Sequence, residues 1–363
     1  MKRLPILAAL LTLWRGCVPL LPAHANEPLL LRGVNLAGAE STGSIFGMPQ
    51  RAAIDYFYDK GMRVFRITFS HERMCPVPGG PLAEPYASRF EAIVGYALAK
   101  PNAQVILDLH SSLRYRVGAT ITDSDVSGGT QVMVGQSGLY TKAQFQDFWA
   151  RMATRFNGSN LIYEIANEPV AWDGSAVPIL GLVATINAGI AGIRSTSAAN
   201  RILFNLNGYG TYGWRTNVST GSDNRANIEN VVDPLKNSLI DMHHYVDKWG
   251  PGTSPKVASD YMSALTGFTA YMRSVGRKAF LGEFGFGSDA VSLAAGTAVL
   301  AYVEANRDVW TGWAYWDAVP YQDSYIFQLL PTELTKIGPF DPLPGKVTHR
   351  PQMNVLAPLL AAP

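Results

Sequence analysis

The sequence predicts a single-domain (β/α)8 barrel, and three observations carry this prediction. Short β-rich apolar runs alternate eight times with helical stretches over about 300 residues, as in parallel strands joined by helices. Several runs are almost continuously apolar, as strands buried on both faces are. No G-x-G-x-x-G motif follows an early strand, which argues against a doubly wound dinucleotide-binding sheet.

The alternation defines the elements in order. The expected strands are Leu29–Leu36, Arg63–Thr68, Gln104–His110, Leu161–Glu168, Arg201–Asn207, Ser238–Tyr245, Ala279–Phe284 and Trp310–Trp316. The expected helices are Arg51–Lys60, Pro85–Lys100, Lys142–Phe156, Pro178–Ala198, Lys256–Val275 and Ala290–Ala305. Gly61, Gly158 and Gly276 follow three of these helices, where a helix C-terminus favours glycine.

The composition is that of a folded globular chain. The 363 residues are 47% hydrophobic and 16% charged, which is too apolar and too weakly charged for a disordered protein. Cys17 and Cys75 are the two cysteines, and Cys17 lies in the segment expected to be removed. Zinc sites built on cysteine pairs are therefore excluded.

Residues 1–25 are predicted to be a signal peptide. Lys2 and Arg3 precede an apolar run that is too short to span a membrane, and Ala23-His24-Ala25 fits the A-x-A cleavage pattern. Removing this segment takes away three cations and no acid, so the formal charge changes from +2 to −1. We expect an exported monomer of residues 26–363, periplasmic or extracellular, with no membrane span and no nucleic-acid partner.

The C-terminal ends of the predicted strands carry the candidate site. In a (β/α)8 barrel the chemistry lies at those ends. They hold polar, charged and aromatic residues, namely Asn35, Arg66, His110, Asn167, Glu168, Asn207, His243, Tyr245, Glu283 and Trp316. A structural barrel has little use for two carboxylates, two histidines and an arginine there, so the set indicates a functional site.

Glu168 and Glu283 are expected to face each other from the fourth and seventh strands. Pro169 cannot donate a strand hydrogen bond, so it ends the fourth strand and presents Glu168 at the mouth. Paired carboxylates split glycosidic bonds, one as a protonated acid and the other as an ionised nucleophile. Arg66 is placed to favour the ionised form of Glu283, because a guanidinium stabilises a neighbouring carboxylate.

Aromatic side chains indicate a cleft for a chain-like ligand. Trp316 ends the eighth strand and offers a flat apolar face to a pyranose ring. Further aromatics fall in loops after strands, namely Trp172, Tyr209, Trp214, Trp249 and Tyr321. No metal or cofactor is expected: the first strand ends in Asn35 instead of an H-x-H pair, and the adjacent His243 and His244 would point to opposite faces.

Seven motifs follow one another along the chain: LRGVNLAGAE, VFRITFSHERM, VILDLHS, YEIANEPV, DMHHYVD, LGEFGFG and GWAYWDAVPYQDSYIF. Together they resemble glycoside hydrolase family 5, in its bacterial and fungal endo-β-1,4-glucanase (cellulase) branch. The resemblance runs from about Leu31 to Leu360. Two loops depart from it, at His110-Ser111-Ser112, where relatives usually carry H-N-Y, and at Ala318–Gln322, where close relatives carry Gly-Pro and a Trp.

The resemblance implies a retaining enzyme that needs no cofactor and cleaves a β-glucan polysaccharide or oligosaccharide. It makes Glu168 the acid/base and Glu283 the nucleophile. It places Asn167 at the 2-hydroxyl of the sugar being cleaved, Trp316 under that sugar and Tyr209 beside the leaving-group sugar. The other substrate-binding positions are Asn35, Arg66, His110, His243 and Tyr245.

The main reading is thus an endo-β-1,4-glucanase, and two kinds of alternative stay open. β-Mannanase and mixed-linkage β-glucanase activities use the same carboxylate machinery. A non-catalytic polysaccharide-binding barrel would keep the aromatic residues, but it has no need for both Glu168 and Glu283.

Overall fold

The computed structural model describes residues 30–210, 224–248 and 250–361. Within them, eight parallel strands close into a barrel in the order β1-β2-β3-β8-β9-β10-β11-β12, and β12 pairs back onto β1. These strands are β1 Leu31–Leu36, β2 Val64–Phe69, β3 Gln104–Leu109, β8 Leu161–Glu164, β9 Ile202–Phe204, β10 Ser238–Tyr245, β11 Ala279–Gly285 and β12 Trp310–Tyr315. The predicted (β/α)8 fold is confirmed, although β8 and β9 end earlier than expected.

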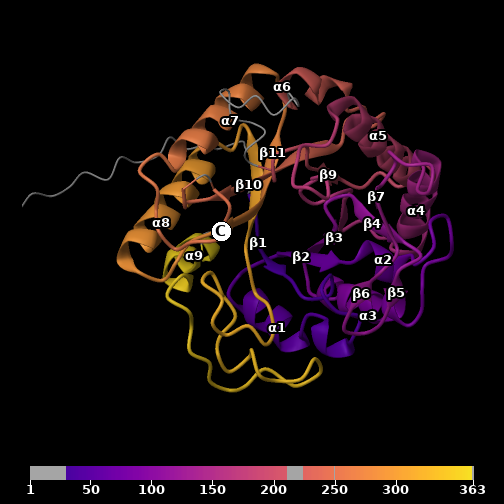
Figure 1. Ribbon diagram of the computed structural model, residues 1–363. Coiled ribbons are helices and arrows are strands. Elements are labelled where there is room, and N and C mark those ends of the chain that lie inside the picture. Colours follow the sequence, from indigo (N-terminus) through magenta and orange to yellow (C-terminus); the bar gives the residue numbers. More distant parts are fainter. Residues whose placement is uncertain (1–29, 211–223, 249, 362–363) are drawn as a thin grey trace, which may run out of the picture.

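Helices surround the barrel (Figure 1). They are α1 Arg51–Asp59, α2 His71–Met74, α3 Tyr86–Leu98, α4 Lys142–Arg155, α5 Ile179–Ser195, α6 Asn224–Asn227, α7 Met262–Ser274, α8 Ala290–Ala305 and α9 Met353–Leu360, with 3-10 turns at Ile45–Gly47 and Ile228–Asn230. Five of the six predicted helices begin at the predicted residue or one later. The exception is α7, whose predicted start at Lys256 is six residues too early.

Side-chain caps fix the starts of two of these helices. Thr141 accepts a hydrogen bond from the Gln144 amide, and the Gln144 side chain accepts one from Thr141 in return, so α4 begins with a capping box. Asp289 accepts from the amides of Val291 and Ser292 at the start of α8. Both caps satisfy amides that have no partner inside the helix.

The interior of the barrel is layered. One side chain from each strand forms an apolar floor, namely Leu31, Val64, Ile106, Ile162, Leu203, Leu239, Phe280 and Ala314. Residues two positions further along a strand point to the same side. On five strands these are the polar residues Arg66, Asp108, Glu164, Asn205 and Asp241, all buried. The floor therefore supports a buried polar layer that faces the C-terminal ends of the strands.

An insertion between β3 and α4 forms two small antiparallel ribbons at the C-terminal end of the barrel. One pairs β4 (Arg114–Val117) with β7 (Thr130–Met133), and the other pairs β5 (Thr120–Ile121) with β6 (Val126–Ser127). The sequence patterns above predict no element in this segment. Because the insertion follows β3, it stands beside the residues that end that strand.

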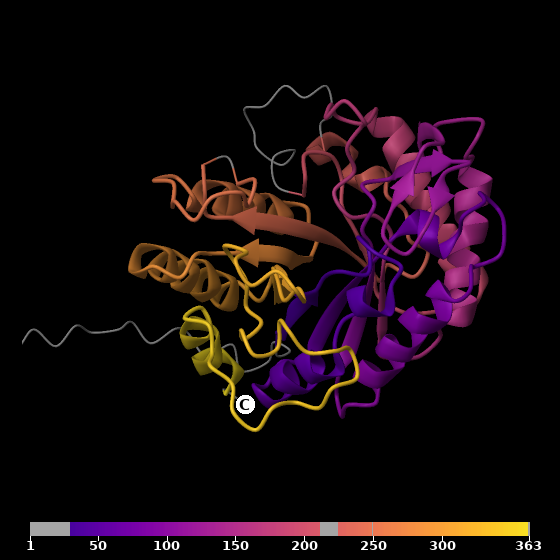
Figure 2. The ribbon, with the colours of Figure 1, turned by 60° about the horizontal axis from the view of Figure 1, so that its bottom comes forward.

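After β12 the chain crosses to α1 before it forms α9, as the yellow segment in Figures 1 and 2 shows. Gln50 Nε2 donates to the carbonyl of Ile337 at 2.6 Å, and the Arg51 amide donates to the carbonyl of Pro339 at 3.2 Å. The last segment thus covers the start of α1, next to the closure of the barrel. Among the described residues, no helix has both the length and the apolar character needed to cross a bilayer.

Candidate active site

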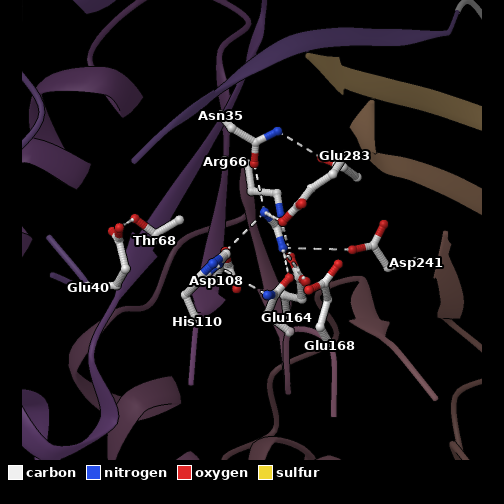
Figure 3. A network of polar contacts seen from close by, with 12 residues as sticks. Asn35, Glu40, Arg66, Thr68, Asp108, His110, Glu164, Glu168, Asp241 and Glu283 are labelled. Carbon is white, nitrogen blue, oxygen red and sulfur yellow. Dashed lines mark hydrogen bonds and ion pairs between the residues drawn. The ribbon is translucent and has the colours of Figure 1, made fainter. Parts of the chain in front are cut away.

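Arg66 is the centre of the buried polar layer. Its guanidinium donates to both carboxylate oxygens of Glu164, at 2.6 and 2.7 Å, and to Glu283 Oε1 at 2.9 Å. It also reaches Asn35 Oδ1 and Asn167 Oδ1, each at 2.7 Å. Figure 3 shows the side chains of Asn35, Glu164 and Glu283 converging on Arg66 from different strands. The guanidinium fork therefore fixes the two amides and one of the paired carboxylates relative to one another.

Glu283 is held by two hydrogen bonds and by a nearby imidazole. Besides Arg66, the Tyr245 hydroxyl donates to Oε2 at 2.8 Å and His243 Nδ1 lies 3.4 Å from Oε2. The pairing of β10 with β11 shifts by one residue at Gly282, which brings Glu283 into register with His243. A Cβ at Gly282 would lie 2.1 Å from Asp241 Oδ1, so glycine is required for this bulge.

Glu168 reaches the site from a tight turn after β8. The strand ends at Glu164, four residues before the predicted end, and Glu168 has a left-handed φ of 41°. Its amide donates to Asn205 Oδ1 at 2.7 Å, and Asn205 donates in turn to the carbonyl of Asp241 at 2.7 Å. These hydrogen bonds hold the turn and aim the Glu168 carboxylate at His243.

The two glutamates lie close together. One carboxylate oxygen of each, together with a ring nitrogen of His243, falls within a mutual distance of 4.8 Å. The Glu168 side chain is 23% exposed and that of Glu283 is 5% exposed. One carboxylate is thus buried and fully hydrogen-bonded, while the other borders solvent.

His243 governs the charge of this pair. Burial opposes its protonation, but the carboxylates of Glu283 and Asp241 outweigh burial and raise the pKa of His243. Burial likewise opposes ionisation of Glu168, but the hydrogen bond and the charge from His243 lower the pKa of Glu168. The Glu168 carboxylate and the His243 ring lie 2.7 Å apart, and each favours the charged form of the other.

A second histidine follows the same pattern on β3. His110 Nδ1 lies 2.8 Å from Asp108 Oδ2, and its ring stacks on Trp316 with centroids 5.3 Å apart and planes 10° apart. Burial alone would lower the pKa of His110, but the Asp108 carboxylate raises it to about 9. His110 Nε2 also faces Asn167 Nδ2 at 3.5 Å. Trp316 and Asn167 are thereby held on either side of His110.

Eight of the predicted positions converge on the two glutamates or their immediate partners: Asn35, Arg66, His110, Asn167, Glu168, His243, Tyr245 and Glu283, with Trp316 joined through His110. Tyr209 follows β9 and is 47% exposed, and it takes no part in this network within the described residues. Asn207 instead bonds the backbone of Val177. Trp214, Trp249 and the segment 1–25 lie outside the described residues.

The motif reading misses three buried carboxylates, Asp108, Glu164 and Asp241. Burial raises the pKa of Glu164 to about 7, against the opposing effect of Arg66. Asp108 and Asp241 each stand two residues before a site histidine and bond it, at 2.8 and 3.1 Å. A repeated D-x-H spacing at two strand ends is therefore the signal that could have found them, since such residues share a face.

Two groups of side chains have the donor types of a metal site, Glu164 with Asp241 and His243, and Glu168 with His243 and Glu283. Both groups fit internal partners better than an ion. Arg66 donates to both oxygens of Glu164 and to Glu283, and a nitrogen of His243 faces each of Glu168 and Asp241. The donor set is that of a charge-compensated network.

Comparisons with known proteins show that the chain is similar to cellulases. Residues 24–319 match the family model described as cellulase (glycosyl hydrolase family 5). Endoglucanase gh5-1 of Neurospora crassa is 30% identical over 312 residues, which cover 82% of this chain and 72% of that protein. A triple mutant of an endo-β-1,4-glucanase from Xanthomonas axonopodis pv. citri is 30% identical with a TM-score of 0.77, covering 92% of this chain and 99% of that one.

A further solved structure is that of XacCel5A in complex with cellopentaose. It is 30% identical with a TM-score of 0.76, and the match covers 91% of this chain and 99% of that chain. The family match extends over most of the barrel and includes both glutamates. This chain belongs to the cellulase family, glycosyl hydrolase family 5.

Proposed function

We propose that the protein is a retaining endo-β-1,4-glucanase, with Glu283 as nucleophile and Glu168 as acid/base. The observation that carries this proposal is that one oxygen of Glu168 and one oxygen of Glu283 lie within 4.8 Å of each other, both beside His243 Nδ1. Retaining glycosidases keep their carboxyl groups about 5–5.5 Å apart, whereas inverting enzymes leave room for a water at about 6.5–9.5 Å. The relatives named endoglucanase and endo-β-1,4-glucanase, and the neighbour with cellopentaose, support the substrate class.

The first step is attack of Glu283 on the anomeric carbon. Arg66 and Tyr245 hold its two oxygens, so the carboxylate is oriented without a side-chain rearrangement during the reaction. His243 passes its proton to Glu168 across 2.7 Å, and Glu168 delivers it to the departing glycosidic oxygen, so Glu168 is ionised and His243 is neutral once the glycosyl-enzyme has formed. The pair holds one proton in either arrangement, so the lowered pKa of Glu168 is compatible with acid catalysis.

The second step is hydrolysis of the covalent glycosyl-enzyme. Glu168, now ionised, removes a proton from the incoming water and restores the proton of the pair. Asn167, His110 and Trp316 surround the place of the sugar ring, and Tyr209 stands after β9 for the leaving-group side. Asn35 has no exposed surface and lies behind them. The Trp316 ring stacks on the His110 ring, and this contact fixes the orientation of the aromatic face that meets the sugar.

The substrate and the stereochemistry can be measured on one purified protein. Carboxymethylcellulose, glucomannan, xylan and lichenan are assayed side by side, and the anomer first released from a cello-oligosaccharide is read by proton NMR. We expect the highest kcat/KM on the β-1,4-glucan and initial release of the β-anomer. Preference for glucomannan would assign a mannanase activity instead, and preference for lichenan a mixed-linkage glucanase activity. Initial release of the α-anomer would contradict the retaining mechanism.

We also propose that residues 1–25 direct export and are removed, which leaves a monomeric catalytic domain of residues 26–363 in the periplasm or outside the cell. The charged start, the short apolar run and Ala23-His24-Ala25 support this proposal. N-terminal sequencing of protein recovered from cell fractions should begin at Asn26. An unprocessed N-terminus in the cytoplasmic fraction would contradict it.

A further inference from the structure

A separate cavity opens beside His110. It measures about 320 Å³ and is lined by residues from the loops after β1, β2, β3 and β8, including Arg73, Arg114, Arg116 and Trp172. His110 forms part of its wall, whereas Glu168, Glu283 and Trp316 do not. The cavity therefore borders the place of bond cleavage without containing it.

The order of the strands places this cavity to one side of the substrate path. Trp316 follows β12 and Tyr209 follows β9, and the proposed function puts the cleaved sugar and the leaving-group sugar at these two residues. Around the barrel, β1, β2, β3 and β8 all lie between β12 and β9 on one arc. A glucan backbone laid from Trp316 to Tyr209 would pass along this arc, and a substituent that projects from it toward His110 would enter the cavity.

The wall of the cavity is built of aromatic and guanidinium groups. Arg114 and Arg116 alternate on β4, and both guanidiniums lie over the Trp172 ring, 5.4 and 4.7 Å from its centroid. Trp172 Nε1 donates to the carbonyl of Val132 on β7 at 3.1 Å, which ties the loop after β8 to the ribbon. Neither Arg114 nor Arg116 forms an ion pair within the part of the chain that the structure describes.

The lining also includes the serine residues Ser41, Ser112 and Ser124. Three carboxylates, those of Glu40, Glu72 and Asp125, line the same cavity and would repel an anion. The combination of an aromatic ring, hydroxyls and charges of both signs suits a neutral sugar.

We propose that this cavity binds a neutral glycosyl branch of the β-glucan and so directs the enzyme to substituted backbones. The proposal rests on the proposed function, because only a site that cleaves the backbone brings a branch to His110. In this proposal the insertion after β3 contributes to branch binding, since it supplies Arg114 and Arg116 to the cavity wall. Ser111 and Ser112, where this sequence departs from its relatives, stand in the same wall.

The test compares kcat/KM on linear cellohexaose with kcat/KM on xyloglucan oligosaccharides of the same backbone length. Arg116→Met removes guanidinium donors and keeps the packing of an unbranched side chain, while Ser124→Trp fills the exposed rim of the cavity. Each variant should lower the ratio of branched to linear kcat/KM about tenfold and leave the linear value within twofold. Arg51→Met is the matched control, because Arg51 also packs over aromatic rings, at 5.0 Å, but does not line the cavity.

Other outcomes overturn the proposal in distinguishable ways. An equal loss on both substrates would make the cavity a subsite for the backbone itself. Cleavage of linear cellohexaose with no activity on the branched oligosaccharides would refute the branch and leave the proposed function intact. A preference for carboxymethyl over hydroxyethyl substituents, lost in Arg116→Met, would assign the cavity to an anion. Inactivity on every β-glucan would refute the proposed function, and the branch pocket with it.

Discussion

His243 Nδ1 lies 2.7 Å from Glu168 Oε1. Nearby carboxylates raise the pKa of His243, and the charge of His243 lowers the pKa of Glu168, so the titration of each group depends on the other. Glu168 and His243 therefore act together as the acid of the reaction. The pH at which this acid loses its proton is set by the pKa of the pair and not by that of either residue alone.

Asp241 affects the pKa of His243 from the other side of the ring, since Asp241 Oδ2 lies 3.1 Å from His243 Nε2. Asp241→Asn should lower the pKa of His243 and move the alkaline limb of the kcat/KM profile to lower pH, by about 1–3 units. The shift is downward because the active form is the protonated one and loses a stabilising negative charge. Asp108→Asn, which faces His110 instead, is the control. An unmoved alkaline limb in Asp241→Asn would separate His243 from acid catalysis.

The division of labour between the glutamates can be read from azide products. In Glu168→Gln, an aryl cellobioside with a good leaving group should still form the glycosyl-enzyme, because its departure needs little protonation. Azide needs no general base, so it should release the intermediate and give a β-glycosyl azide. In Glu283→Ala, direct displacement should give the α-azide. An α product from Glu168→Gln, or no rescue of either variant, would reverse or refute the assignment.

Trp316 should matter for turnover more than for stability. It is half-buried, and its contact with His110 is a ring stack at the mouth of the barrel. Trp316→Ala should reduce kcat on a long β-glucan by about 10²-fold or more, because contacts that position the ring lower the barrier. Trp316→Phe keeps an aromatic face and should retain much of the activity. Unchanged kinetics in the alanine variant would leave Trp316 a packing residue only.

Arg66 should matter for both stability and activity. Arg66→Met would leave the carboxylates of Glu164, Glu283 and Asp108 buried without their shared cation, which costs about 3–5 kcal/mol of unfolding free energy. Chemical denaturation measures this cost, and kcat of the folded fraction should also fall. Arg194→Met is the matched control, since it breaks a buried bidentate pair with Asp233, outside the site. Equal kcat losses in the two variants would indicate a general loss of folding.

Much of the fold could be predicted because the apolar runs of parallel strands and the caps of helices depend on residues that are close together in the sequence. The ring of strand-end residues could also be predicted, since the order of β1 to β12 brings distant ends together. The turn at Glu168 could not be predicted, because its left-handed φ accompanies a hydrogen bond to Asn205, which directly follows β9. The insertion after β3 was missed because its strands are two to four residues long and carry little periodicity.

Buried carboxylates were missed for a different reason. Glu164 sits where an apolar strand residue is expected, and only Arg66, 98 residues away in sequence, makes its burial tolerable. A strand pattern read alone counts such a residue as an interruption. Layers become visible only when all eight strands are aligned, with the apolar floor in one row and Arg66, Asp108, Glu164, Asn205 and Asp241 in the next.

Closure of the barrel has a consequence for how the site comes into being. Asn35 Nδ2 donates to the carbonyls of Gly282, Ala314 and Tyr315, which lie 247, 279 and 280 residues further along the chain. A growing polypeptide that has not yet reached β12 cannot make the contacts with Ala314 and Tyr315, however well its earlier strands pair. Long-range contacts of this kind slow folding. The N-terminal half of the chain alone thus cannot form the closed barrel. The complete site for cleaving a polysaccharide forms only after the final strand has been added.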